Sequence, residues 1–178
     1  MYTYGQVERA LAQLHGIPPE RAAGKLRSRL KHFSRIGLTP SRPGKGQKLL
    51  YTSMDCARWA ICLEFAQLET PPERVKQILA IYGSSILKSF AGPMPEEDVI
   101  FWGEANFFAE AVTGKRESFF NFMPPSQAAD MLKGTEVRRP VNRLIALNLT
   151  HVKRELAKTL GIDWEIPRRL LGRTDWER

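Results

Sequence analysis

Residues 21–48 read RAAGKLRSRLKHFSRIGLTPSRPGKGQK, and this stretch decides how the first half of the chain is interpreted. It holds nine Lys and Arg residues and no Asp or Glu. An acid-free run of this length is typical of a surface that meets a polyanion, and double-stranded DNA is the partner that we expect. The candidate DNA-binding residues are these nine cations and two polar neighbours: Arg21, Lys25, Arg27, Ser28, Arg29, Lys31, His32, Arg35, Arg42, Lys45 and Lys48.

Apolar residues repeat at helical spacing within this stretch, at Ala22, Leu26, Leu30 and Phe33. The pattern predicts an amphipathic helix from Pro19 to Ile36, opened by proline and ended at Gly37. Arg27, Lys31 and Arg35 are expected roughly opposite the apolar face, as in a recognition helix seated in a major groove. The alternative is a solvated basic face that binds nothing.

The residues after Gly37 predict a different local structure. Two prolines and two glycines between Leu38 and Lys48 exclude a helix, and the run from Lys48 to Thr52 is suited to a short strand. We interpret this segment as a hairpin with a basic tip, or wing. Arg42, Lys45 and Lys48 would then reach phosphates beside the groove that the helix enters.

The stretch from Leu30 to Leu38, LKHFSRIGL, resembles the Leu-Arg-Tyr-Tyr-Glu-Arg-Ile-Gly-Leu signature of the MerR family of winged-helix regulators. The similarity continues through the wing, through Ser53–Arg58 and through Thr70–Leu79, and it covers about residues 3–82. It implies a winged helix-turn-helix with two trailing helices and a bacterial transcription regulator. The family's long coiled-coil helix has no counterpart after Pro93.

Further helices are expected in the first half of the chain. A helix is predicted from Thr3 to Leu14, with Val7 and Leu11 on its apolar face. Together with the basic helix it would form a helix-turn-helix. Ser53 is expected to cap a helix that runs to Leu68. Thr70 and Glu73 are expected to form a capping box, with Pro71 at the first helical position.

Charge divides the chain. Residues 1–92 hold 14 Lys and Arg against 6 Asp and Glu, whereas residues 93–178 hold 13 of each. We therefore expect a DNA-binding domain over 1–92 and a dimerisation, effector or partner-binding domain over 93–178. No membrane span and no signal peptide are visible, so a cytoplasmic, nucleoid-associated location is expected. Cys56 and Cys62 are expected to be buried and unpaired.

The second half predicts a small α+β domain, so that the whole chain is expected to be α+β and mostly α. Strands are predicted over Val99–Trp102, Ser118–Met123 and Arg143–Leu149, with a short helix over Pro125–Leu132. Thr150 would then cap a helix from His151 to Leu160. A continuous helix from Val141 to Leu160 is the alternative, because apolar residues also recur there at helical spacing.

Catalytic and cofactor motifs are absent from the sequence. There is no nucleotide-binding glycine motif, the three histidines are scattered, and no Cys lies in residues 93–178, so neither a cofactor nor a metal is predicted. Glu104, Glu110 and Asp130 are interpreted as surface carboxylates and not as a catalytic set. The aromatic residues of the second half could line an effector pocket, but a core or a subunit interface is the more usual role.

These features favour a sequence-specific transcription regulator without enzymatic activity. It is expected to bind DNA as a homodimer held by residues 98–160, with RNA polymerase as a further candidate partner. A phage-type excisionase or architectural protein that bends DNA is the alternative. A nucleic-acid enzyme or an RNA-binding factor is a third class.

Overall fold

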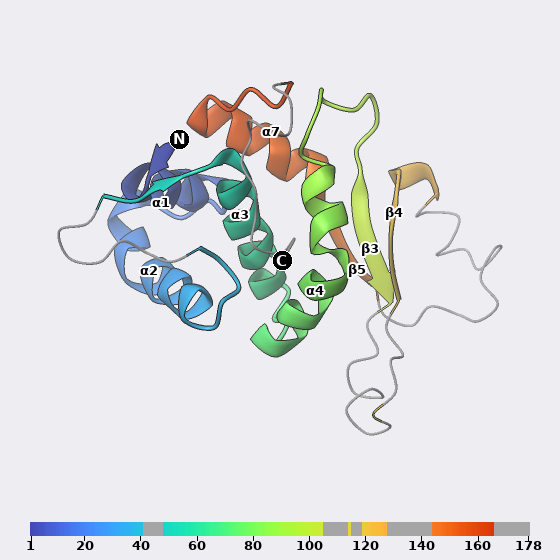
Figure 1. Cartoon of the computed structure of the whole chain (residues 1–178), viewed down its shortest axis with the longest axis horizontal. Coiled ribbons are helices and arrows are strands. Elements are labelled where there is room, and N and C mark those ends of the chain that lie inside the picture. The colour runs from blue at the N-terminus through green and yellow to red at the C-terminus, as the bar shows by residue number, and fades with distance from the viewer. Residues whose placement is uncertain (41–47, 105–113, 115–118, 128–143, 166–178) are drawn as a thin grey trace. The chain divides into compact units, whose positions relative to one another are not determined.

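The computed structural model describes residues 1–40, 48–104, 114, 119–127 and 144–165 (Figure 1). Two compact units are present, residues 1–94 together with the segment from Val152, and residues 95–151. The predicted class, α+β and mostly α, is confirmed. The elements are β1 (Tyr2–Thr3), α1 (Tyr4–Leu14), α2 (Pro19–Arg35), β2 (Leu50–Tyr51), α3 (Ser53–Gln67), α4 (Pro72–Lys88), β3 (Ile100–Glu104), β4 (Phe119–Met123), β5 (Leu144–Asn148) and α7 (Leu149–Leu160).

The helix expected over Thr3–Leu14 is present as α1. Thr3 is its N-cap, and its hydroxyl and the Gln6 side chain form a reciprocal capping box that satisfies two backbone donors. Val7 and Leu11 are buried, as their spacing predicted. Gly16 ends the helix with a φ of 61°, a left-handed conformation that glycine adopts without steric cost.

The basic helix is present as α2, and its bounds match the prediction to within one residue. Leu26, Leu30 and Phe33 are buried, which confirms the apolar face at these three positions. Gly37 closes the helix with a φ of 76°, and the Leu38 N–H donates to the Phe33 carbonyl at 3.0 Å. The chain therefore leaves α2 in a fixed direction.

The strand expected over Lys48–Thr52 is shorter than predicted and pairs with the N-terminus. Leu50 lies opposite Thr3 and Tyr51 opposite Tyr2 in an antiparallel pair. The base of the predicted wing is thus anchored to the residues that precede α1. The tip of the wing, residues 41–47 with Arg42 and Lys45, lies outside the described residues.

Three predicted helix starts are wrong in detail. α7 begins at Leu149, so Thr150 lies inside this helix and is not its cap. The N-cap of α3 is Thr52 and not Ser53, because Asp55 is the residue placed to complete a capping box with it. The box expected from Thr70 and Glu73 does not form: α4 begins at Pro72, and Pro71 occupies the cap position without a side-chain bond. Pro72 therefore fills the first helical position, where the missing N–H costs nothing.

The first unit contains the C-terminal segment as well as the first half of the chain. Lys153 on α7 is only 1% exposed, and its Nζ donates to the carbonyls of Gly92 at 2.9 Å and Pro93 at 2.8 Å. The Gly92 N–H donates in turn to the Trp164 carbonyl, and the Trp164 ring packs against Phe90. The division expected at 92/93 thus differs from the structure, since the helix from Val152 packs with the first unit.

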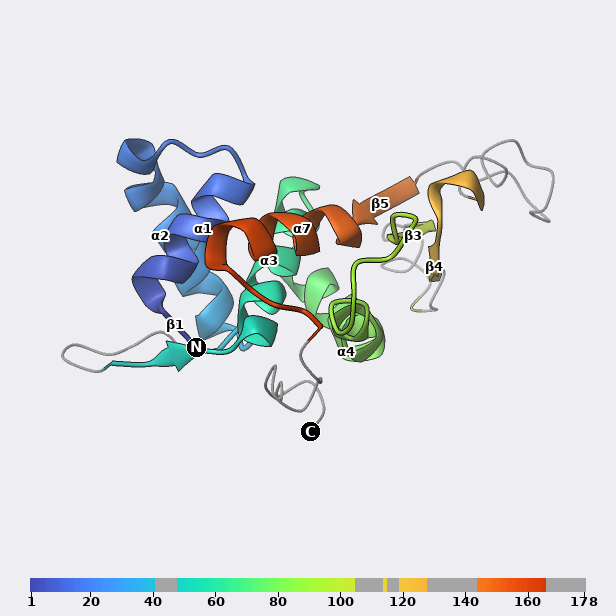
Figure 2. The same cartoon turned by 90° about the horizontal axis from the view of Figure 1, so that it is seen from above.

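The second unit is built on an antiparallel sheet of three strands in the order β4-β3-β5. β5 runs directly into α7 (Figure 2), which confirms a strand followed by a helix and excludes a continuous helix from Val141 to Leu160. Phe101 lies opposite Phe122 and Leu147 in the register and stacks on Phe120 at 5.3 Å. Phe101, Phe120 and Leu147 are buried, so these aromatic residues belong to the core of the unit.

Pro125–Gln127 are helical, and the rest of the short helix expected there lies outside the described residues. Phe107, Phe108 and Trp176 also lie outside them. No helix in the described part of the chain combines the length and apolarity needed to cross a membrane.

Candidate nucleic-acid interface

The candidate interface is the exposed side of α2. The buried residues of α2 pack the helix against the core. Its last turn carries the basic residues His32 and Arg35, and positive charge at this end is stabilised by the helix dipole. Lys31 and Arg35 are exposed, and Ser28 shares their side of the helix. These residues lie away from Leu26 and Leu30, as predicted.

Two further candidates of α2 lie on the side of the helix that faces α3. Lys25 and Arg29 are exposed and line a small cavity of about 210 Å³ with residues of α3. Lys48 is exposed just before β2. Arg21 belongs to the first turns of α2, and only its backbone is described.

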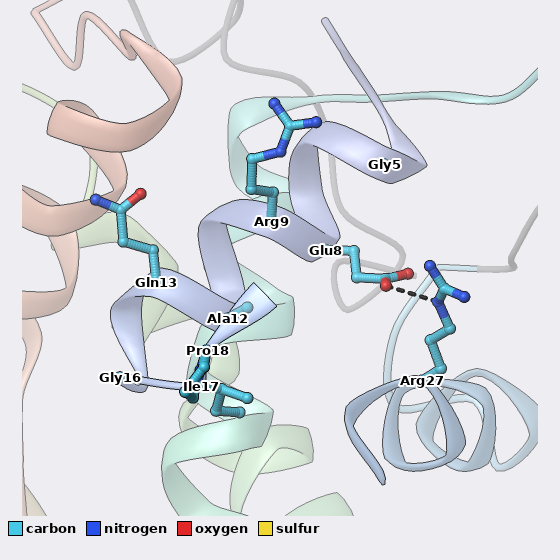
Figure 3. Close-up of a pocket in the computed structure, with 9 residues that line it drawn as sticks. All are labelled: Gly5, Glu8, Arg9, Ala12, Gln13, Gly16, Ile17, Pro18 and Arg27. Atoms are coloured by element: carbon cyan, nitrogen blue, oxygen red, sulfur yellow. Dashed lines mark hydrogen bonds and ion pairs between the residues drawn. The ribbon is translucent and has the colours of Figure 1, made fainter. Parts of the chain in front are cut away.

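Arg27 lies at the flank that faces α1, not opposite the apolar face with Lys31. Its Nε donates to Glu8 Oε1 at 2.6 Å, and this ion pair joins α1 to α2. The Glu8 side chain is 12% exposed and the Arg27 side chain 55%. Figure 3 shows the carboxylate of Glu8 reaching across toward the guanidinium.

A cleft of about 620 Å³ lies beside this ion pair (Figure 3). Ala12, Ile17 and Pro18 supply apolar walls, and Arg9 and Gln13 of α1 also line it. Arg9 is exposed. The cleft therefore brings a second arginine, from a different helix, close to the basic surface of α2.

A hydrogen bond links two of the predicted residues at the end of α2. Arg35 Nη2 lies 3.2 Å from His32 Nδ1, and His32 is half-buried. Because a guanidinium can only donate, the His32 Nδ1 in this contact is the acceptor, which leaves the proton of a neutral ring on Nε2. His32 would thus offer a donor beside the cation of Arg35.

The C-terminal end of α2 is held by Arg58 of α3. Arg58 is buried, and it donates from Nε to the Leu38 carbonyl at 2.7 Å and from Nη2 to the Gly37 carbonyl at 3.2 Å. These carbonyls follow the helix directly, where helical backbone partners have run out. The position of α2 is therefore fixed from α3 as well as from α1.

His15, which follows the last residue of α1, packs against two residues of α3. Its Nδ1 lies 2.6 Å from Gln67 Nε2 and 3.6 Å from Glu64 Oε1. The second distance would suit an ion pair, but burial lowers the pKa of His15 to about 4, so the ring is neutral at pH 7. The contact with Glu64 is then one between a carboxylate and an uncharged ring.

The cysteines are confirmed as buried and unpaired. Burial raises the pKa of the Cys56 and Cys62 thiols to about 12, so both stay protonated at neutral pH. Within the described ranges no group of three or more His, Cys, Asp or Glu side chains could hold a metal ion. Glu110, Asp130 and the side chain of Glu104 lie outside the described part.

Sequence reasoning missed the contribution of α1. Glu8, Arg9 and Gln13 lie outside the acid-free stretch, so a search for a run of like charge could not include them. The helical period offers a weak signal, because Arg9 and Gln13 are four residues apart and fall on one side of α1. The pairing of Glu8 with Arg27 spans 19 positions and has no local signal.

No protein-family model matches the chain, and a search of curated proteins finds no match.

Proposed function

We propose that this protein is a sequence-specific regulator of transcription that binds duplex DNA through the exposed side of α2 and the basic segment after it. One observation carries the proposal: a helix seated by Leu26, Leu30 and Phe33 presents Lys31 and Arg35 outward, and no acid lies within residues 21–48. The resemblance of residues 30–38 to the MerR signature supports it. The protein acts by binding and not by catalysis.

Electrostatics explain why such a surface would select a polyanion. Each cation that neutralises a phosphate releases counterions, and the gain depends steeply on salt concentration. The exposed cations of α2 sit on a rigid element, so they meet a duplex in one arrangement. Phosphate contacts would set the position of the helix, and groups able to contact base edges would set the sequence.

Salt titration tests the proposal. The variant K31A/R35A removes two exposed cations from α2, and K76A/K88A removes two exposed cations from α4. Binding to a 24-base-pair duplex is measured between about 50 and 200 mM salt. The slope of log K against log[salt] should shrink by about 2 in magnitude for the α2 variant, since each phosphate contributes about 0.9. The α4 variant should keep the wild-type slope, and equal losses in both variants would contradict the assignment of α2.

We further propose that two copies bind paired half-sites, with RNA polymerase as a candidate partner, since one recognition helix spans few base pairs. Residues 98–160 were expected to hold the dimer. Val152 and Leu156 are already buried, and so are Phe101 and Phe120, so the contact must use other residues of this range. Sedimentation of the full chain at micromolar concentration, with and without DNA, should give a dimer; a monomer under both conditions would contradict this part of the proposal.

A further inference from the structure

The ion pair between Glu8 and Arg27 distinguishes Arg27 from the other cations of α2. Lys25, Arg29, Lys31 and Arg35 form no ion pair with another residue that the structure describes. Arg35 hydrogen-bonds His32 on its own helix. Among the described cations of α2, Arg27 is thus the one that an acid on another helix holds in place.

Glu8 is placed where its charge requires a partner. The residue is 9% exposed, and a carboxylate so far removed from water is costly unless it is paired. Its bond to Arg27 Nε, at 2.6 Å, is short and charge-assisted. The ion pair also constrains Arg27, because the bond to Glu8 limits the rotamers of a long and otherwise flexible side chain.

The atom that Glu8 engages decides what the rest of the guanidinium can do. With Nε donating to the carboxylate, the four N–H groups on Nη1 and Nη2 have no acceptor among the described residues and can serve another one. Arg27 is 55% exposed, so that end of the side chain can be reached from outside. Two parallel donors in a fixed plane match a pair of neighbouring acceptors, and guanine presents such a pair, O6 and N7, in the major groove.

We infer that Glu8 is a positioning residue that holds Arg27 for an end-on, bidentate contact with a guanine base edge. The inference rests on the proposed function and assigns sequence discrimination to one residue. Glu8 itself does not touch DNA; it acts through Arg27. Lys25, Arg29 and Lys31 are exposed and form no ion pair with another described residue, so they serve as phosphate contacts, because a flexible cation neutralises charge without reading a base.

The test begins with selection from a randomised 24-base-pair duplex library, using the full-length wild-type chain. Binding of each variant is then measured on the selected duplex and on duplexes with single base-pair changes. R27A should lower the preference for one G·C pair by about 5- to 150-fold, the range for one bidentate contact. E8A should lower the preference at the same pair, whereas E8Q, whose amide oxygen still accepts from Nε, should retain most of it.

A double variant separates positioning from a general loss of structure. In E8A/R27A the preference should equal that of R27A, because Glu8 has no effect once Arg27 is absent. A merely structural role for Glu8 would weaken binding to all duplexes equally and leave the base-pair preference unchanged. Retention of the full preference by E8A, or tighter binding by E8A, would overturn the inference.

R27K supplies the test if E8A does not fold. This variant keeps the positive charge beside Glu8 but lacks the planar pair of donors. It should lose the base-pair preference as R27A does, with the salt slope of the wild type. Full preference in R27K would overturn the inference. If the wild-type chain selects no sequence at all, the proposed function itself fails, which is a different outcome.

Discussion

Replacement of Arg58 by Met should destabilise the first unit, although Arg58 is a charged residue. The residue is 4% exposed and donates to two carbonyls, those of Leu38 and Gly37, at 2.7 and 3.2 Å. Met fills much of the same volume but donates to neither carbonyl. Leu38 is buried whereas Gly37 is exposed to water, so the Leu38 carbonyl is the acceptor whose loss of a partner is costly. One buried acceptor left without its donor predicts a loss of about 1–3 kcal/mol.

The assay is urea unfolding of the wild type, R58M and a control, R29M, which removes an exposed arginine from α2. R29M should stay within about 0.5 kcal/mol of the wild type, as surface substitutions usually do. Because the chain has two compact units, unfolding is followed by tryptophan fluorescence with W102F added to all three chains, since Trp102 is the tryptophan that lies within residues 95–151.

Amide hydrogen exchange provides a local readout of the same change. Loss of the Arg58 contacts should speed exchange at Leu38, whose N–H bonds to Phe33 only while the end of α2 is closed. R58K should fall between R58M and the wild type, since one ammonium cannot reproduce the fork of donors. A destabilisation below about 1 kcal/mol in R58M, with unchanged exchange at Leu38, would refute the argument that Arg58 holds this end of the helix.

Two further predictions concern buried titratable groups. The pKa of His15 is lowered to about 4 in the folded chain, whereas histidine in an unfolded chain has a pKa of about 6.5. The free energy of unfolding should therefore fall by up to about 3 kcal/mol as pH drops from 6.5 to 4. Urea unfolding at several pH values should show a weaker pH dependence in H15Q, and an equal pH dependence in the two chains would contradict the prediction. Cys56 and Cys62, with pKa values raised to about 12, should resist a thiol reagent at pH 8 in the folded chain and react in denaturant.

Helices were the part of the fold that the sequence predicted best. α1 and α2 each show a long apolar period, a clear start and a glycine at the end, and these local signals agree with one another. The errors fall where two local signals compete. Thr52 and Ser53 can both cap a helix. Asp55 decides between them, because it occupies the third helical position when Thr52 is the cap and can then complete the capping box.

Segments whose pattern fits two periods could not be decided from the sequence. Residues 141–160 are apolar at helical spacing, yet Leu144–Asn148 is a strand because β3 supplies a partner, with Phe101 opposite Leu147. The partner of β2 was equally inaccessible, since β1 lies some 48 residues earlier in the chain. Pairing across such separations is a property of the folded chain and leaves no local period to detect.

The candidate interface shows the same division between local and distant information. The residues of α2 could be proposed from charge and period alone, but the contacts that orient them come from outside the stretch. Glu8 of α1 binds Arg27 in the middle of α2, and Arg58 of α3 binds the carbonyls just after its end. A helix held at two separate points by neighbouring elements has little freedom to rotate about its axis.

The two contacts that hold α2 would limit the orientations in which its exposed residues can meet DNA. A helix that could roll would present Lys31 and Arg35 in many orientations and would recognise only the charge of a duplex. With the helix fixed from both flanks, the exposed row would meet DNA in one register, which is the condition for reading bases. Substitutions at Glu8 and Arg58, although neither lies on the exposed row, should therefore alter sequence preference more than they alter the electrostatic attraction to DNA.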